Sequence, residues 1–141
     1  MDEDEVAVLA ANRTFYDAFE RRDLDTMSEL WERSARAVCT HPGWATLRGW
    51  SQISASFFAL FRGQGTLQFV LTQEEAAMRG DVAWVSVDEN LLGDQGGSTV
   101  AALNVFARDR HGRWRMVAHH GSVVNGPLPT FTLRQDPAPD A

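Results

Sequence analysis

The spacing of hydrophobic residues changes once along the chain. Up to about residue 62, apolar positions recur every three or four residues, which is typical of helices with one buried face. Beyond Gly63, short strand-like runs are separated by turn residues. Helices followed by strands favour an α+β fold in which a sheet packs on the helices.

The first half predicts three helices and one strand. We expect helices over about residues 5–22, 24–31 and 50–61, and a strand over residues 35–40. Asp23 or Asp25 can cap the second helix, since an aspartate oxygen accepts hydrogen bonds from the free amides of a first turn. Pro42 and Gly43 end the strand, and Gly49 precedes the third helix.

The second half predicts a meander of strands and one chain-length domain. Strands are expected over residues 67–72, 82–92, 99–108 and 114–124. Gly80 and Gly112 mark hairpin turns, and residues 93–98 form a longer, flexible connection. We expect a single domain over 1–141, with its core at 5–124 and a Pro-rich tail at 125–141 that frays.

The later strands are apolar on both faces. In the segment 83–91, Trp84 lies on the face opposite Val85 and Val87, and the segment 99–108 shows the same pattern. A sheet with one solvated face would alternate more cleanly. We therefore expect a symmetric homodimer through the outer sheet face, although a bulge or a covering tail is an alternative explanation.

The charge balance restricts the possible partners. The formal net charge is −6, and all 13 basic residues are arginines, so a lysine Schiff base and a phosphate-loop lysine are excluded. No cationic cluster is present that would neutralise nucleic-acid or lipid phosphates. We expect no nucleic-acid and no membrane partner, and instead a small organic molecule or another protein.

The sequence also indicates a cytoplasmic setting. Cys39 is the single cysteine, which excludes an internal disulfide and a cysteine zinc cluster and fits a reducing compartment. The chain begins with acidic residues where a secretory signal would be basic, and no apolar run reaches the length of a membrane span.

Three segments occur in an order that is characteristic of a known family. They are Arg-Asp-Leu-Asp at 22–25, Val-Cys-Thr-His-Pro-Gly-Trp at 38–44 followed by Leu-Arg-Gly-Trp at 47–50, and Trp-Arg-Met-Val-Ala-His-His-Gly-Ser at 114–122. Together they resemble the SnoaL-like branch of the nuclear-transport-factor-two-like superfamily, which has a cystatin-like fold and includes ketosteroid isomerase. The resemblance implies a cone: a curved antiparallel sheet wraps the long first helix and encloses a pocket. It also implies homodimers through the outer sheet surface.

The superfamily does not by itself fix an activity, because it includes isomerases, cyclases, dehydratases, hydrolases and association domains. Ketosteroid isomerase has a catalytic aspartate before a proline where this chain has His41, and an oxyanion-binding aspartate where it has Asn104. Its tyrosine falls on Phe15, one position before Tyr16, and one helical step turns a side chain by about 100°. Steroid isomerisation is therefore not expected, but proton abstraction beside a carbonyl, cyclisation or hydrolysis remains open.

Histidines are the first catalytic candidates. His41 ends a strand at the expected pocket, and an unperturbed pKa of about 6.5 suits a general base. Its alternative role is structural, with the ring bonded to a turn carbonyl. Parity with Trp114 predicts that His120 and Ser122 face inward, while His119 faces the dimer side. A structural role for His120 is an equal alternative.

Glu89 and Asn104 are the other catalytic candidates. Glu89 shares a strand face with apolar residues, so it is expected to be buried and paired with His41, His120 or Arg48. The alternative is an exposed glutamate at a strand end, with Asp88 inward if the register slips. Asn104 is either a pocket donor or the support of a bulge.

Aromatic residues are expected to form the ligand-binding wall. The candidates for ligand contact are Tyr16, Trp44, Trp50, Phe57 and Ser122, although core packing is the simpler account of Phe57. His41, Glu89 and His120 have side chains that suit a metal, but no spaced motif supports such a site. We expect no metal and no cofactor.

These observations lead to one hypothesis and one alternative. The hypothesis is a small-molecule-binding homodimer that performs cofactor-independent isomerase, cyclase or hydrolase chemistry with His41 as general base. The alternative is a non-catalytic oligomerisation or association module. An open cavity in which His41 meets a carboxylate favours the enzyme, and a filled cone favours the module.

Overall fold

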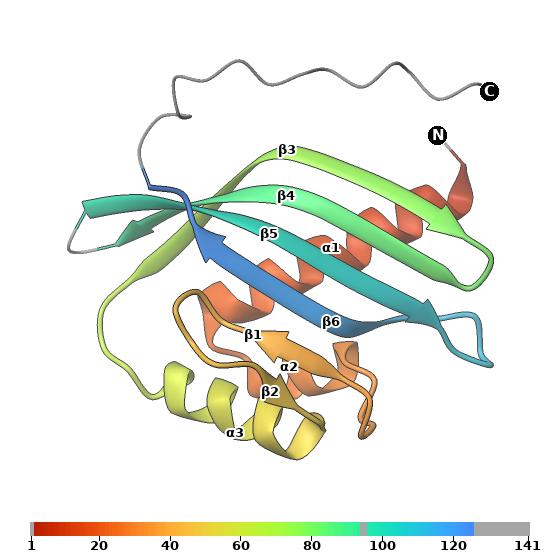
Figure 1. The fold of residues 1–141 in the computed structure, drawn as a ribbon, viewed down its shortest axis with the longest axis horizontal. Coiled ribbons are helices and arrows are strands. Elements are labelled where there is room, and N and C mark those ends of the chain that lie inside the picture. Colours follow the sequence, from red (N-terminus) through yellow and green to blue (C-terminus); the bar gives the residue numbers. More distant parts are fainter. Residues whose placement is uncertain (1, 94–95, 126–141) are drawn as a thin grey trace.

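A curved, unclosed six-stranded sheet wraps around the first helix (Figure 1). The structure is a computed structural model and describes residues 2–93 and 96–125. Its elements are α1 (Glu3–Arg21), α2 (Leu24–Leu30), β1 (Val38–Thr40), β2 (Leu47–Arg48), α3 (Trp50–Phe61), β3 (Leu67–Arg79), β4 (Val82–Gly93), β5 (Gly96–Arg108) and β6 (Trp114–Val123). The predicted α+β class and all three predicted helices are confirmed.

The strands follow the order β2-β1-β6-β5-β4-β3. Neighbours are antiparallel except β1 and β6, which run parallel, so the prediction of a purely antiparallel sheet is wrong for this pair. Strand β2 was not predicted, because a two-residue strand has no measurable period. The Gly80 and Gly112 turns connect β3 to β4 and β5 to β6, as predicted.

Helix α1 lies across the inner face of the sheet and packs against β3, β4 and β6. Asp2 caps its first turn by accepting a 2.7 Å hydrogen bond from the amide of Glu5. The helix ends at Arg21, and the next residue, Arg22, caps it in the left-handed conformation at φ 54°. Its buried face includes one polar residue, Asn12, between Val8 and Phe15.

Helix α3 packs beside the short strands β1 and β2, and α2 packs against α1, α3 and β6. Asp23 caps α2 by accepting a 3.0 Å bond from the amide of Thr26, as predicted. Ile53 and Phe57 on α3 are fully buried, and Ser56 lies between them on the same face. This face of α3 therefore borders the interior of the fold.

A β-bulge in β6 reverses which side chains face inward. Val105 pairs with Ala118 and Phe106 pairs with Met116, so Val117 is an extra residue in the ladder. Beyond it, odd-numbered residues face inward: His119 is 3% exposed.

The prediction that His120 and Ser122 face inward is therefore wrong, and both are exposed. The alternation of Trp114 and Met116 does not continue past Val117, because the bulge there is an irregularity that hydrophobic periodicity does not reveal.

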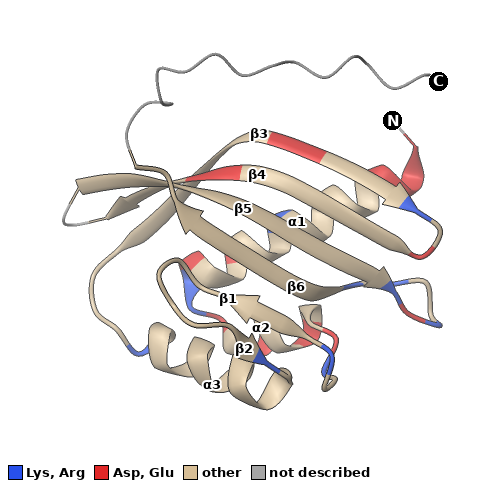
Figure 2. Ribbon diagram, viewed as in Figure 1, with Lys and Arg blue, Asp and Glu red and all other residues tan. Residues whose placement is uncertain are grey.

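A second bulge, in β3, turns an acidic side chain inward. The pairing register with β4 shifts between Thr72 and Glu75, and Gln73 has a φ of 57°. As a result Glu74, rather than its neighbours, points toward α1. Figure 2 shows acidic segments within β3 and β4, whereas arginines gather at the ends of elements.

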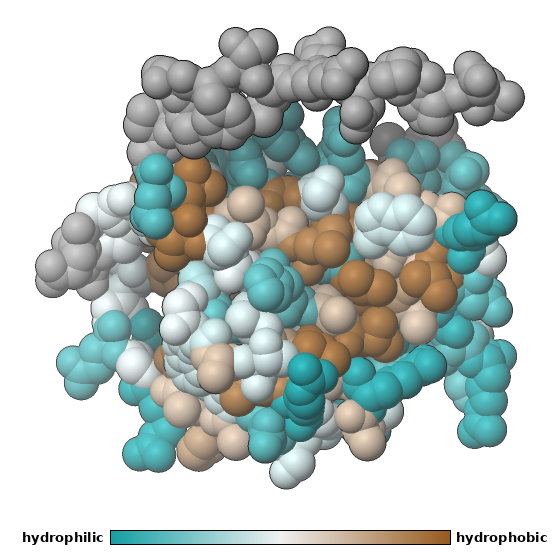
Figure 3. Space-filling model, viewed as in Figure 1, coloured by the Kyte–Doolittle hydropathy of each residue, from teal (hydrophilic) through white to brown (hydrophobic). Residues whose placement is uncertain are grey.

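The outer face of the sheet is apolar, as expected from the pattern of the later strands. Trp84 and Leu103 are 39% and 44% exposed on this face. Trp84 pairs with Val105, which pairs with Ala118, so an apolar row crosses three strands. Figure 3 shows the hydrophobic patch on the side facing the viewer.

The predicted flexible connection at 93–98 is wrong for its described residues, because Gly93 ends β4 and residues 96–98 belong to β5. Residues 94–95 of that connection, and almost all of the predicted Pro-rich tail, at 126–141, lie outside the described residues. Among the residues that are described, no helix combines the length and the hydropathy that crossing a bilayer requires.

Candidate functional site

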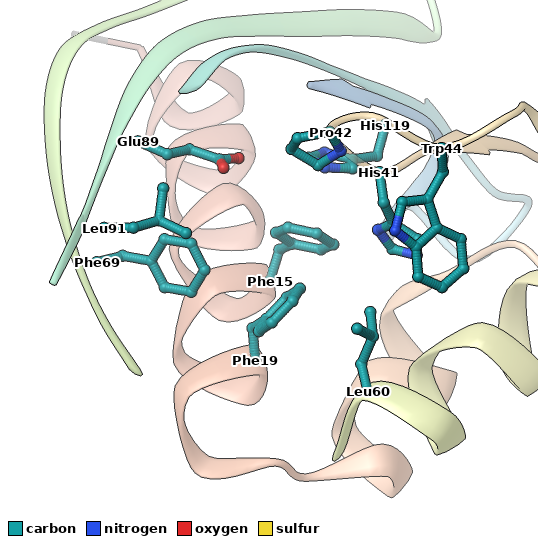
Figure 4. Close-up of a pocket in the computed structure, with 10 residues that line it drawn as sticks. All are labelled: Phe15, Phe19, His41, Pro42, Trp44, Leu60, Phe69, Glu89, Leu91 and His119. Atoms are coloured by element: carbon teal, nitrogen blue, oxygen red, sulfur yellow. The ribbon is translucent and has the colours of Figure 1, made fainter. Parts of the chain in front are cut away.

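A cavity of about 130 Å³ lies between α1, α3, β4 and the end of β1 (Figure 4). This is close to the size of a cavity that holds one benzene ring. Seven residues form its apolar wall: Phe15, Phe19, Pro42, Trp44, Leu60, Phe69 and Leu91. Three polar residues complete the lining: His41, Glu89 and His119.

Glu89 supplies the only carboxyl group of the cavity lining in the described structure, and it is 4% exposed. The hydroxyl of Tyr16, on α1, donates a 2.6 Å hydrogen bond to its Oε2 atom. Burial raises the pKa of Glu89 to about 7, although the bond from Tyr16 opposes part of this shift. The structure thus buries Glu89, but its partner is Tyr16 and not His41, His120 or Arg48.

Tyr16 remains protonated because of the same environment. Its ring is 1% exposed. Burial and the neighbouring charge of Glu89 both raise the pKa of the Tyr16 hydroxyl above its usual value. Tyr16 does not line the cavity but holds one oxygen of the residue that does.

Asn104 lies behind the cavity and joins three buried side chains. Its Nδ2 atom donates to Asn12 Oδ1 at 2.8 Å and to the Tyr16 hydroxyl at 3.0 Å. Its Oδ1 atom lies 2.5 Å from Nδ1 of His119. Asn104 is fully buried and is absent from the cavity wall, so it orients pocket residues rather than facing the pocket itself.

Asn12 and Glu74 extend this network to the far side of α1. Asn12 Nδ2 donates a 2.7 Å bond to Glu74 Oε2, and Arg13 lies 3.6 Å from the other carboxylate oxygen. Neither residue was identified from the sequence. Asn12 had a visible signal, since it is a polar residue in the apolar stripe of α1. Glu74 had none, because the bulge beside it sets its direction.

His119 is the second buried histidine, and the prediction that it faces the dimer side is wrong. Its ring packs on Phe15 at a centroid distance of 4.8 Å and lies 6.3 Å from the ring of His41. Burial, with smaller contributions from the neighbouring His41 and His120, lowers the pKa of His119 to about 3. His119 is therefore uncharged at neutral pH.

His41 lines the cavity, but its ring is already hydrogen-bonded. Nε2 lies 2.9 Å from Ser56 Oγ, and that hydroxyl donates a 2.7 Å bond to the carbonyl of Ile53. Burial lowers the pKa of His41 to about 4, which makes it a weak base at neutral pH. The sulfur of Cys39 lies 3.7 Å from Nε2, and burial raises the pKa of that thiol to about 12.

The predicted aromatic wall is only partly formed. Trp44 meets His41 edge-on at 4.8 Å and is 44% exposed, so it stands at the mouth of the cavity. Trp50 instead packs against Trp31 at 6.1 Å, and Phe57 is fully buried behind His41. Neither Trp50 nor Phe57 borders the cavity.

The side chains considered for a metal do not come together. Glu89 and His41 face the cavity, but His120 is on the outer face of the sheet. In the described ranges, no cluster of three or more His, Cys, Asp or Glu residues is arranged to hold a metal ion.

The chain is similar to proteins that share this fold. A candidate dehydratase of the NTF2-like family from Streptomyces avermitilis is 36% identical, with a TM-score of 0.81 over 87% of this chain and 97% of that one. A candidate calcium/calmodulin-dependent protein kinase type II association domain from Thiobacillus denitrificans is also 36% identical, with a TM-score of 0.71 over 82% and 94% of the two chains.

A plant protein is related over much of the same length. The F-box protein SKIP8 of Arabidopsis thaliana is 29% identical over 118 residues, which is 84% of this chain and 50% of that protein. The chain thus spans about half the length of this curated relative. The SnoaL-like domain profile matches residues 8–126. The chain therefore belongs to the family of SnoaL-like domains, as its sequence motifs indicated.

Proposed function

We propose that the cavity binds a small organic molecule and that Glu89 transfers a proton to or from it without a cofactor. The observation that carries this proposal is the carboxyl group of Glu89, 4% exposed on the wall of an open apolar cavity. Tyr16 occupies Oε2, so Oε1 is the oxygen available to a ligand. This assigns the acid-base role to Glu89 in place of His41.

The protonation behaviour of Glu89 supports this assignment. A group with a pKa of about 7 is present at neutral pH in both its acid and its base form, which suits proton transfer in either direction. His41 and His119, with pKa values of about 4 and 3, are almost entirely unprotonated there. Neither histidine can supply a proton as efficiently at that pH.

The apolar wall supports the same chemistry. Phe15, Phe69 and Leu91 line the cavity together with Glu89, and burial is the physical cause of the raised pKa of its carboxyl group. A pocket with mostly apolar walls and few polar groups is typical of small-molecule sites. The ring-sized volume limits the part of a ligand that is enclosed to about six heavy atoms.

Dehydration is the reaction that we favour, because of the 36% identical candidate dehydratase. In this reaction Glu89 takes a proton from the carbon beside a carbonyl. The electron pair then forms a carbon–carbon double bond while the β-hydroxyl leaves. Glu89 returns its proton to that hydroxyl, which departs as water, so one carboxyl group serves as base and then as acid.

The proposal is tested with small β-hydroxy ketones in D₂O, followed by proton NMR. Wild type is expected to produce enone or to exchange the protons beside the carbonyl, and Glu89→Gln is expected to lose both activities. Glu75→Gln, which changes an exposed glutamate of β3, is the matched control and should retain them. Equal activity in Glu89→Gln and wild type would refute the role of Glu89.

The association-module alternative has its own support. The cavity is open, as the enzyme hypothesis expected, but His41 meets Ser56 rather than a carboxylate. The exposed Trp84 and Leu103 suit a symmetric contact with a second copy of the chain, and the candidate association domain is 36% identical. We infer a homodimer through the outer sheet face, which is compatible with either function.

A further inference from the structure

A buried hydrogen-bond network joins Glu74, Asn12, Asn104 and His119. Its donors and acceptors can be assigned in order, because Glu74 at one end can only accept. Glu74, beside Arg13, is a carboxylate and can only accept hydrogen bonds. The atom of Asn12 that faces it must therefore be the amide nitrogen, at 2.7 Å. This leaves Asn12 Oδ1 as the acceptor of the 2.8 Å bond from Asn104.

The same assignment of donors and acceptors determines which nitrogen of His119 carries the hydrogen. Both hydrogens of the Asn104 amide are used, one toward Asn12 and one toward the Tyr16 hydroxyl. The remaining atom, Asn104 Oδ1, can only accept, so the hydrogen between it and His119 belongs to Nδ1 of the histidine. A neutral histidine with hydrogen on Nδ1 carries a bare lone pair on Nε2.

Turning the side-chain amides of Asn104 and Asn12 around would be unfavourable at the hydrogen bond between Asn12 and Glu74. If Asn104 were turned, its oxygen would face Asn12 Oδ1, so Asn12 would have to turn as well. The oxygen of Asn12 would then face the carboxylate of Glu74 at hydrogen-bond distance with no hydrogen between them. The network thus holds His119 in one tautomer.

The other donors near the cavity are also engaged. The Ser56 hydroxyl donates to Ile53, so it accepts the single hydrogen of neutral His41 at Nε2. The Tyr16 hydroxyl donates to Glu89. Apart from the indole of Trp44 at the mouth, the described lining presents acceptors and the carboxyl group itself, and it includes no arginine.

We propose that the cavity selects an uncharged ligand whose hydroxyl group donates a hydrogen bond to Nε2 of His119. This inference rests on the proposed ligand-binding function and names its substrate class: a hydroxyl-bearing ring or chain of about benzene size. An anionic ligand would meet the carboxylate of Glu89 and the lone pairs of His119 Nε2 and His41 Nδ1, with no cation in the lining. A ligand with acceptors alone would leave the His119 lone pair unpaired.

The first test is the tautomer of His119 in the wild-type protein. Long-range proton–nitrogen NMR correlation at pH 8 is expected to show hydrogen on Nδ1 and an unprotonated Nε2. A histidine with hydrogen on Nε2 would overturn the inference. This measurement needs no variant and no ligand.

The second test compares phenol with fluorobenzene, which has similar size but no donor, by NMR titration at pH 8. His119→Phe is expected to weaken phenol binding about tenfold, the effect of one hydrogen bond, and to change fluorobenzene binding less than twofold. His120→Ala, an exposed neighbour, is the control and should leave both affinities unchanged. Benzoate is expected not to bind.

The outcomes separate this inference from the proposed function. Phenol affinity that is unchanged in His119→Phe, or tight benzoate binding, would refute the hydroxyl donor while leaving Glu89 chemistry intact. A selective loss of phenol binding would support it even if Glu89→Gln retained turnover. No binding of phenol to wild type at millimolar concentration would refute the inference itself.

Discussion

Tyr16 and Glu89 are 73 positions apart in the sequence and are joined by a 2.6 Å hydrogen bond between α1 and β4. The bond fixes one oxygen of the carboxyl group and leaves the other toward the cavity. It also stabilises the ionised form of Glu89, in opposition to burial. The reactivity of the site therefore depends on how the long helix docks against the sheet.

Tyr16→Phe is expected to raise the pKa of Glu89 above about 7, because the hydrogen bond that favours the carboxylate is lost while burial remains. The free energy of unfolding should fall by about 1 kcal/mol or more, since Asn104 also loses a partner. Carbon-detected NMR titration of the glutamate side chains measures the first effect and chemical denaturation the second.

Thr14→Ala removes another hydroxyl from α1, one that bonds to the carbonyl of Ala10 on the exposed side. It serves as the control and should leave the pKa of Glu89 unchanged. A pKa in Tyr16→Phe equal to that of wild type would show that the hydrogen bond does not tune the carboxyl group.

Glu89→Gln is expected to change how stability depends on pH. The pKa of Glu89 is raised from 4.5 to about 7 on folding, so between these values the folded state keeps a proton that the unfolded state has released. The contribution of Glu89 to the free energy of unfolding is thus fully present below pH 4.5 and is lost as the pH rises through about 7. The glutamine of the Glu89→Gln variant stays neutral, so the variant loses no free energy of unfolding from this position.

The variant should therefore gain stability relative to wild type as the pH rises from 4.5 to 7, by about 3 kcal/mol. Denaturation at both pH values measures this difference, and the contributions of His41 and His119 cancel in it. A difference that does not vary with pH would mean that Glu89 is solvated and not tuned by burial.

Hydrophobic spacing was sufficient to predict the helices and most of the long strands, although it ended β3 at residue 72 and the strand continues to Arg79. Those elements bury one face, and burial imposes the period that reveals them. The family resemblance added the curved shape and the pocket. Glu89 was identified for the same reason as the core, because it shares the inward face of β4 with Val85 and Val87.

Features that depend on irregular backbone could not be predicted in the same way. The bulge at Val117 exchanged the directions of His119 and His120, and the bulge after Thr72 brought Glu74 to Asn12. A bulge adds one residue without changing local composition, so no periodicity marks it.

Ser56→Ala is expected to destabilise the fold while leaving the hydrogen bond of the Glu89 carboxyl group intact. The variant leaves the buried N–H of His41 without its acceptor, at a loss of about 1–3 kcal/mol in the free energy of unfolding. Ser51→Ala, at an exposed position of the same helix, is the matched control. Equal losses in the two variants would indicate that the hydroxyl of Ser56 does not hold His41.

Leu103→Arg is expected to convert a dimer into a monomer. Leu103 is 44% exposed in the middle of the outer face, and a symmetric contact would place its two copies close together. Two arginines there would be desolvated without acidic partners, a penalty of several kcal/mol that a dimer contact would not offset. Light scattering should show about twice the chain mass for wild type and one chain mass for the variant.

Phe58→Arg provides the control, because Phe58 is 53% exposed on α3 rather than on the sheet. It adds the same charge at a similarly exposed apolar position, so it should leave the mass unchanged if the sheet face is the contact. A wild-type monomer at micromolar concentration would refute the dimer. Dissociation by Phe58→Arg but not by Leu103→Arg would move the contact from the outer face of the sheet to α3.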